Sequence, residues 1–323
     1  MSHTKIKTIF IGTSDFGIPA LRVLLKDKQF EIIAVITQPD KPTGRKQILT
    51  PPPIKAEAEK YQIPVFQPGR INNLKSQIAN LKSQIIIVAA YAQIIPEEIL
   101  NLPKYGCINI HGSLLPKYRG AACVQAAILN NDKQTGITII KMDKGLDTGP
   151  ILWQDKINIE SGDTAGALYE KLSLLGAKIL PVAIKKYIAG EIKPIPQNNA
   201  KASYVKRLKK QDGLIDWAKS AVEIERFIRA MAPWPSAYTI TKNKKQKTKN
   251  SLMLKLLESE HEILQINKNK YKIGEIFLYN NKLAVQCGKD ALIIKKLQLE
   301  GKKEMKSEDF IKGNNWIIGS ILK

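Results

Sequence analysis

Residues 106–112 read Gly106-Cys107-Ile108-Asn109-Ile110-His111-Gly112, an apolar run that ends in an amide and an imidazole. A short β-branched run between two glycines is typical of a buried strand. Residues at i and i+2 of a strand point to the same face, so Asn109 and His111 share one face and the two isoleucines share the other. Two polar side chains aimed together from a strand end indicate a functional site more than a packed core.

The first half of the chain alternates such strands with helical stretches. The predicted strands are 8–11, 31–37, 64–66, 85–89, 107–111 and 136–141, and the predicted helices are 19–26, 53–60, 71–81, 121–129 and 164–189. Alternation of this kind predicts an α/β fold with a doubly wound, mostly parallel, Rossmann-like sheet. Ligands bind such sheets beyond the carboxyl ends of the strands, where Asn109 and His111 are expected.

The pattern changes beyond about residue 208. Residues 191–208 contain prolines and polar residues and are predicted to link residues 1–190 to residues 209–323. A helix at 218–231 is followed by predicted strands at 252–257, 274–279, 283–287 and 292–297. Several short strands with tight turns predict a small β-barrel.

The chain of 323 residues has a formal net charge of +22, and residues 206–323 are the more basic part. This charge favours a polyanionic partner, above all a nucleic acid. A lysine-rich composition with lysines on solvated faces explains the charge equally well, and both interpretations stay open. The same two interpretations apply to the lysine-rich stretch 242–249.

The three cysteines have no zinc-ligand spacing, and an odd number argues against a disulfide framework. We therefore expect no metal site and a reducing, cytoplasmic location. The first predicted strand begins almost at the amino terminus, which leaves no room for a signal peptide. No apolar run approaches the roughly 20 residues that span a membrane.

The polar pair suggests a chemistry. Asn109 and His111 can donate hydrogen bonds toward one point, which suits a carbonyl oxygen that becomes negative in a tetrahedral transition state. Asp147 lies in a glycine-rich loop after the strand 136–141, from which its carboxylate could orient the imidazole and accept a proton. No serine or cysteine is evidently paired with a base, so we expect no covalent intermediate.

These motifs resemble a known family. Asn109-x-His111-x-Ser113-Leu114-Leu115-Pro116 together with Asp147-Thr148-Gly149 resembles the 10-formyltetrahydrofolate-dependent formyltransferases. The resemblance implies that Asn109 and His111 polarise the formyl group and that Asp147 orients His111 and relays a proton. It also implies that Ser113, Leu114, Leu115 and Pro116 contact the folate.

Further motifs resemble the branch of this family that formylates methionyl-initiator tRNA. They are the loop from Gln38 to Arg45, Arg119-Gly120-Ala121-Ala122, the segment from Arg229 to Pro235 and the segment from Leu297 to Lys303. The resemblance implies that Arg45, Lys41 and Lys46 contact the tRNA and that the carboxy-terminal domain is an OB-like barrel with a basic face. It departs at Lys46 and Ala92, where the family usually has glycine, and at Cys123, where proline is common. We expect a monomer.

Three alternatives stay open. A formyltransferase acting on a small amine, such as glycinamide ribonucleotide or an amino-sugar nucleotide, lacks the combination of an arginine-bearing loop and a basic terminal barrel. A formyltetrahydrofolate hydrolase is expected to carry an extra amino-terminal regulatory domain. A non-catalytic RNA-binding protein would bind RNA in a salt-sensitive way without formylating it.

Overall fold

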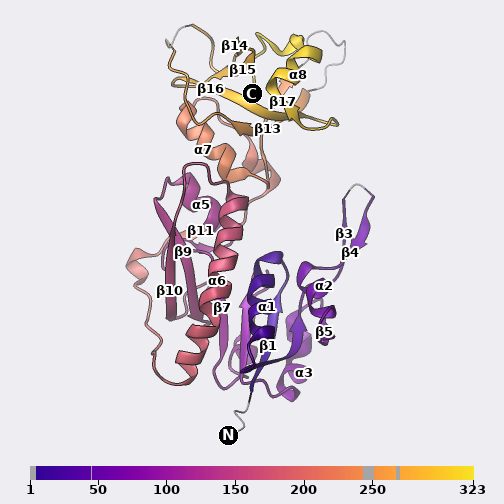
Figure 1. Cartoon of the computed structure of the whole chain (residues 1–323), viewed down its shortest axis with the longest axis vertical. Helices are drawn as coiled ribbons and strands as arrows, with labels where there is room; N and C mark the ends of the chain where they lie inside the picture. The colour runs from indigo at the N-terminus through magenta and orange to yellow at the C-terminus, as the bar shows by residue number, and fades with distance from the viewer. Residues whose placement is uncertain (1–4, 45, 243–250, 267–269) are drawn as a thin grey trace. The chain divides into compact units, whose positions relative to one another are not determined.

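The computed structural model describes residues 5–44, 46–242, 251–266 and 270–323 (Figure 1). The chain divides into two compact units. One comprises residues 1–123, 134–158 and 169–205, and the other comprises residues 124–133, 159–168 and 206–323. We call them the sheet unit and the barrel unit and describe each by itself. Within the described ranges, no helix is long and apolar enough to cross a membrane.

The sheet unit is built on seven strands in the order β10-β9-β7-β6-β1-β2-β5. Their bounds are β1 Ile6–Gly12, β2 Phe30–Ile36, β5 Val65–Phe66, β6 Ile85–Ala89, β7 Cys107–His111, β9 Gln134–Lys141 and β10 Ile151–Asn158. The strands from β7 to β5 are all parallel to their neighbours, which confirms the mostly parallel, Rossmann-like sheet. β9 and β10 are antiparallel, and the sequence did not predict β10. The sequence did not indicate β10 because four of its eight residues are polar or charged, and three of these are exposed, so the strand lacks a continuous apolar run.

The two faces of this sheet have different partners. On one face, Ile9, Val88 and Cys107 belong to a core cluster that includes residues of the helical segments at 71–80 and 97–100. Cys107, Asn109 and His111 are alternate residues of β7 and therefore lie on the same face. The polar pair thus lies on the face of this core cluster, beyond its last apolar residue on the strand. On the other face, a Cβ built at Gly176 would lie 2.9 Å from Ile110 Cγ2, which shows how closely helix α6, Ala165–Ile188, packs there.

The predicted helices are confirmed to within a few residues, and two short helices that the sequence did not predict are added. The bounds are α1 Ile18–Lys26, α2 Pro53–Glu59, α3 Lys75–Asn80, α4 Glu97–Leu100, α5 Cys123–Leu129, α6 Ala165–Ile188, α7 Ala221–Met231 and α8 Ser307–Gly313, of which α4 and α8 are the added helices. Single 3-10 turns occur at Asp15–Gly17, Ile71–Leu74, Asn199–Lys201, Lys210–Gly213 and Asn315–Ile317. α7 begins with a capping box, in which Ser220 Oγ accepts from Glu223 N and Glu223 binds Ser220 N in return.

Two small strand pairs complete the sheet unit. β3 Lys41–Thr43 and β4 Ile48–Thr50 form an antiparallel hairpin after β2, which projects from the body of this unit in Figure 1. β8 Arg119–Gly120 pairs in parallel with β11 Tyr204–Val205. The second pair joins the loop after β7 to a segment predicted as a linker.

The barrel unit has an antiparallel sheet in the order β12-β13-β16-β15-β14, with β17 paired to β16. The bounds are β12 Ala237–Lys242, β13 Ser251–Ser259, β14 Ile276–Tyr279, β15 Lys282–Gln286, β16 Ala291–Leu299 and β17 Met305–Lys306. Residues 319–323 bridge the two edge strands. Lys323 exchanges two backbone hydrogen bonds with Ile240 of β12, while Ile276 N of β14 donates to Ser320 O. Hydrogen bonding thus continues around the sheet, as expected for a small barrel.

Candidate active site at the carboxyl end of β7

Three of the predicted site residues lie together at the end of β7. Asn109 Nδ2 lies 3.4 Å from Asp147 Oδ1, and His111 Nδ1 lies 3.6 Å from Asp147 Oδ2. The His111 side chain is 7% exposed and that of Asp147 is 15% exposed. Both contacts exceed the roughly 3.2 Å upper end of an ordinary N–H···O bond. The three side chains therefore face one another at distances longer than ordinary hydrogen bonds.

The second nitrogen of His111 has a fixed partner. His111 Nε2 lies 3.0 Å from Tyr118 O. A carbonyl oxygen only accepts hydrogen bonds, so this contact requires a hydrogen on Nε2. Nδ1 is consequently the nitrogen that faces Asp147.

Asp147 reaches this place through a loop that doubles back. Because β9 is antiparallel to β7, its last residue, Lys141, lies beside Ile108, below the polar pair. The loop of residues 142–150 then returns along β7 to bring Asp147 beside Asn109 and His111. A strand parallel to β7 would have placed its following loop at the site directly.

The loop is held at several points. Asp143 Oδ1 accepts from Gly145 N at 3.0 Å and from Thr148 Oγ1 at 2.6 Å. Asp147 itself has a left-handed backbone with φ of 53°, and its Oδ2 accepts from Gly120 N at 2.8 Å. A Cβ at residue 120 would lie 2.3 Å from Val205 O, so only glycine fits where this donor must approach.

The segment predicted to contact folate forms a tight turn beside the site. Ser113 is fully buried and its Oγ donates to Lys117 O at 2.6 Å. Leu115 is also buried, and its backbone N donates to Thr138 Oγ1 of β9 at 3.0 Å. Leu114 and Pro116 are partly exposed. The Ser113 and Leu115 contacts fix the shape of the turn, while contact of the segment with a folate stays a prediction.

Loops after three parallel strands are joined at the same edge of the sheet. Tyr91, after β6, accepts through its carbonyl oxygen from Thr13 Oγ1 at 3.2 Å and from Gln38 Nε2 at 3.3 Å. Burial of the Tyr91 ring raises the pKa of its hydroxyl to about 12, so the group stays protonated at neutral pH. These hydrogen bonds fix the positions of the three loops relative to one another at the edge of the sheet that carries the Asn109–His111–Asp147 trio.

The predicted tRNA contacts fall on the β3–β4 hairpin, not beside the trio. Lys41 and Lys46 are exposed, and Arg45 lies outside the described residues, as does most of the lysine-rich stretch 242–249. The hairpin begins after Asp40, whose carboxylate binds Lys55 Nζ at 2.9 Å and accepts from Gln67 Nε2 at 2.6 Å. The hydrogen bond from Gln67 and then that from Lys55 lower the pKa of Asp40, which keeps this anchor ionised.

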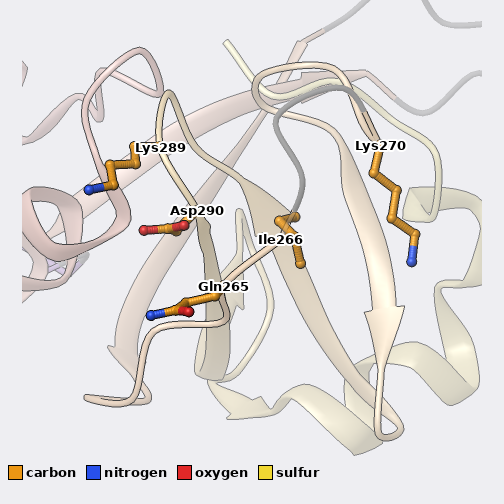
Figure 2. Close-up of a pocket in the computed structure, with 5 residues that line it drawn as sticks. All are labelled: Gln265, Ile266, Lys270, Lys289 and Asp290. Carbon is orange, nitrogen blue, oxygen red and sulfur yellow. The ribbon is translucent and has the colours of Figure 1, made fainter.

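A separate pocket lies in the barrel unit. It has a volume of about 740 Å³ and is lined by Gln265, Ile266, Lys270, Lys289 and Asp290. In Figure 2 the two lysines lie on opposite sides, with the other three residues between them. Its charged groups do not converge on one point, so we do not place the reaction there. Over the described ranges, no group of three or more histidine, cysteine or acidic side chains is arranged to hold a metal ion.

Comparison with known proteins decides the family. Residues 4–184 match the family model described as formyl transferase, and residues 207–315 match that of the formyl transferase C-terminal domain. The methionyl-tRNA formyltransferase of Methylacidiphilum infernorum is 43% identical, with 98% of both chains covered. That of Bacillus subtilis is 40% identical over 98% of this chain and 97% of its own.

The chain belongs to the methionyl-tRNA formyltransferase family. Among solved structures, that of WlaRD, a sugar 3N-formyltransferase studied with dTDP and 5-N-formyl-THF, is 26% identical. It matches with a TM-score of 0.64 and covers 92% of this chain and 99% of its own. HypX from Aquifex aeolicus, solved with tetrahydrofolic acid, is 16% identical with a TM-score of 0.63 and shares the fold over 97% of this chain and 47% of its own.

In this member of the methionyl-tRNA formyltransferase family, two supports of the site were not predicted from the sequence. The motif Arg119-Gly120 resembles the family but indicates no role for either residue by itself, although Gly120 N binds Asp147. Gln197 lies in the predicted linker, although its side chain binds the loop that carries Asp147. A glycine after a buried turn was a usable signal for the first, whereas a lone glutamine among prolines gave none for the second.

Proposed function

We propose that the chain transfers the formyl group of 10-formyltetrahydrofolate to the α-amino group of methionyl-initiator tRNA. One observation carries the proposal. Asn109, His111 and Asp147 meet at the carboxyl edge of the sheet in a chain that aligns end to end with methionyl-tRNA formyltransferases. The amine forms a bond to the formyl carbon, the bond from that carbon to N10 of the folate breaks, and the products are N-formylmethionyl-tRNA and tetrahydrofolate.

Asn109, His111 and Asp147 have different roles in this reaction. Asn109 Nδ2 and His111 stabilise the formyl oxygen as it becomes negative; because His111 Nε2 is already bound to Tyr118 O, His111 donates from Nδ1, which carries a hydrogen in the imidazolium form. The attacking amine must lose a proton, and the Asp147 carboxylate accepts it directly or through a water molecule. The proton finally replaces the formyl group on N10, so the reaction is balanced without a further reactant.

The donor and acceptor are expected at different places on the sheet unit. The turn from Ser113 to Pro116 lies beside the trio and presents its partly exposed Leu114 and Pro116 to the folate. WlaRD, which shares the fold, was solved with a formylated folate, and this supports a folate donor here. Lys41, Arg45 and Lys46 of the hairpin are proposed to contact tRNA phosphates, together with the more basic residues 206–323. We further propose a monomer that acts in the cytoplasm, with domains at 1–190 and 209–323.

The role of Asp147 is tested with Asp147→Asn, which keeps the shape of the side chain and removes its basicity. We expect turnover of methionyl-initiator tRNA to fall by roughly 10²- to 10⁴-fold, because a general base is removed. KM for both substrates should change little. Asp216→Asn is the matched control, since Asp216 Oδ1 accepts from Ala218 N in the barrel unit and an asparagine keeps that bond. Turnover of Asp147→Asn close to that of the control would remove Asp147 from the mechanism.

A sugar amine is the second candidate acceptor, because WlaRD matches nearly the whole chain. Replacing the tRNA by an amino-sugar nucleotide in the same assay distinguishes the two. We expect no formylated sugar, since the exposed cationic hairpin suits a polyanion much larger than a sugar nucleotide. Formylation of the sugar in preference to the tRNA would reverse the assignment of the acceptor.

A further inference from the structure

Residues 194–205, which the sequence marked as a linker, are built onto the sheet unit. Ile195 and Ile151 exchange two backbone hydrogen bonds of 2.8 Å. Farther along, β11 pairs with β8, and Ser203 O accepts from Arg119 N at 2.8 Å. The segment is therefore held at both of its ends, and the side chain of Gln197 lies between these two anchors.

Gln197 joins a buried cation to the loop that carries Asp147. Its Oε1 accepts from Arg119 Nε at 3.1 Å and from Arg119 Nη2 at 2.8 Å. Its Nε2 donates to Asp147 O at 2.8 Å and to Gly149 O at 2.7 Å. An amide has two donor hydrogens and two acceptor lone pairs, so these four bonds use all of its capacity.

Arg119 fixes which way this amide points. Arg119 is 1% exposed, and a guanidinium only donates hydrogen bonds. Its other hydrogen bonds go to Asn199 Oδ1 at 2.7 Å and Tyr204 OH at 2.8 Å, so neutral acceptors hold it in place. The oxygen of Gln197 must face Arg119, and the NH₂ group must then face the two loop carbonyls. Only an uncharged amide with this orientation satisfies both neighbours.

We infer that Gln197 is a positioning residue for the catalytic carboxylate. It holds the loop backbone on both sides of Thr148, while Gly120 N, next to Arg119 in the chain, holds the carboxylate itself. Arg119 and Gln197 thus set the place from which Asp147 faces His111 and Asn109. This inference rests on the proposed role of Asp147. It means that residues 194–205, predicted as part of a linker, contribute to turnover.

The test uses Gln197→Leu in the full chain, which keeps the size of the side chain and removes its four hydrogen bonds. We expect kcat for methionyl-initiator tRNA to fall by about 10- to 100-fold, because a small displacement of a catalytic group has an effect of that order. KM for tRNA and for folate should stay within about threefold, since the contacts that bind both substrates in the ground state are unchanged. Gln197→Glu, which keeps an acceptor for Arg119 but sets oxygens against the loop carbonyls, should lower kcat in the same way and serves if Gln197→Leu does not fold. Asn198→Ala is the matched control, because Asn198 Oδ1 accepts from Ala200 N of its own segment.

A double variant separates positioning from a general structural role. If Gln197 acts through Asp147, then adding Gln197→Leu or Gln197→Glu to Asp147→Asn lowers kcat by no more than about twofold further. A wild-type kcat in the Gln197 variants, or a full additional decrease in the double variants, would overturn the inference. Failure of the proposed function is distinguishable, because it appears as no formylated tRNA from the wild-type protein, whereas failure of the proposed role of Asp147 appears as full activity of Asp147→Asn by itself.

Discussion

The end of β7 and the β3–β4 hairpin belong to the same unit and are built in opposite ways. At the end of β7, His111, Ser113 and Arg119 are buried, and each has a specific hydrogen-bond partner. In the hairpin, all strand positions of β3 and β4 are exposed, including Ile48 at 62% and Leu49 at 64%. This difference agrees with the roles that we propose, in which the buried end of β7 holds the reacting groups and the exposed hairpin meets a large charged partner.

The largest effect is expected from substitutions at the buried end of β7. Asn109→Ala and His111→Ala should each lower turnover by roughly 10²-fold or more, because each removes a donor from the developing oxyanion. Steady-state kinetics with methionyl-initiator tRNA measures the change, and KM should be nearly unaffected. Asn72→Ala, at an exposed asparagine of the same unit, is the control. A variant that keeps wild-type turnover shows that its residue is not a donor to the reacting oxygen.

A smaller effect, on tRNA binding and not on turnover, is expected from substitutions in the exposed β3–β4 hairpin. Replacing Lys41 and Lys46 by alanine should raise KM for tRNA by about tenfold and make the salt dependence of binding shallower, by about 0.9 in log–log slope for each phosphate that is no longer neutralised. Turnover at saturating tRNA and folate binding should be preserved, since the trio is untouched. The double variant of the exposed Lys26 and Lys28 provides a charge-matched control. An equal weakening of folate binding would contradict the assignment of the hairpin to tRNA.

The smallest effect concerns stability at α2, which follows the hairpin. Glu57, whose side chain is 3% exposed, binds Arg22 Nε at 2.6 Å, and the hydrogen bond from Arg22 is the main cause that lowers its pKa to about 2. Since the folded-state pKa lies below the unfolded one, this stabilisation is complete above about pH 4.5 and is lost as the pH falls toward 2. Because Arg22 is 48% exposed, we expect Glu57→Gln to cost only about 1–2 kcal/mol near pH 7.

Urea unfolding at several pH values measures this destabilisation. The difference between Glu57→Gln and the wild type should narrow between about pH 5 and pH 2, where the native carboxylate becomes protonated. Glu59→Gln is the control, because Glu59 is exposed two positions farther along the same helix. A difference that stays constant across this range would mean that Glu57 acts through packing and not through its charge.

Much of the fold could be predicted because it depends on local patterns. The run 85–89 forms β6, every residue of which is buried, and the strand 107–111 has the predicted bounds. The direction of β9 could not be predicted, because the same apolar run serves a parallel or an antiparallel strand. The segment that closes the predicted barrel could not be predicted either, because closure depends on backbone bonds between Lys323 and Ile240, which are distant in the sequence.

The site could be predicted in part for a similar reason. Asn109 and His111 are two residues apart, so the geometry of a strand alone puts them on one face. Asp147 is a candidate from its glycine-rich loop after the strand 136–141 and from the resemblance together, because its loop takes an indirect path that spacing does not reveal. The roles of Gly120 and Gln197 depend on hydrogen bonds to Asp147, which lies 27 and 50 residues away in the sequence. Each bond involves a backbone group, which every residue type carries, so the sequence does not reveal it.

The most direct test of the central claim offers the protein 10-formyltetrahydrofolate with one of two acceptors, methionyl-initiator tRNA or methionyl-elongator tRNA. Formation of N-formylmethionyl-tRNA is followed at equal concentrations of each. We predict formylation of the initiator and little or none of the elongator. No product from the initiator tRNA, with folded protein and intact donor, would contradict the claim.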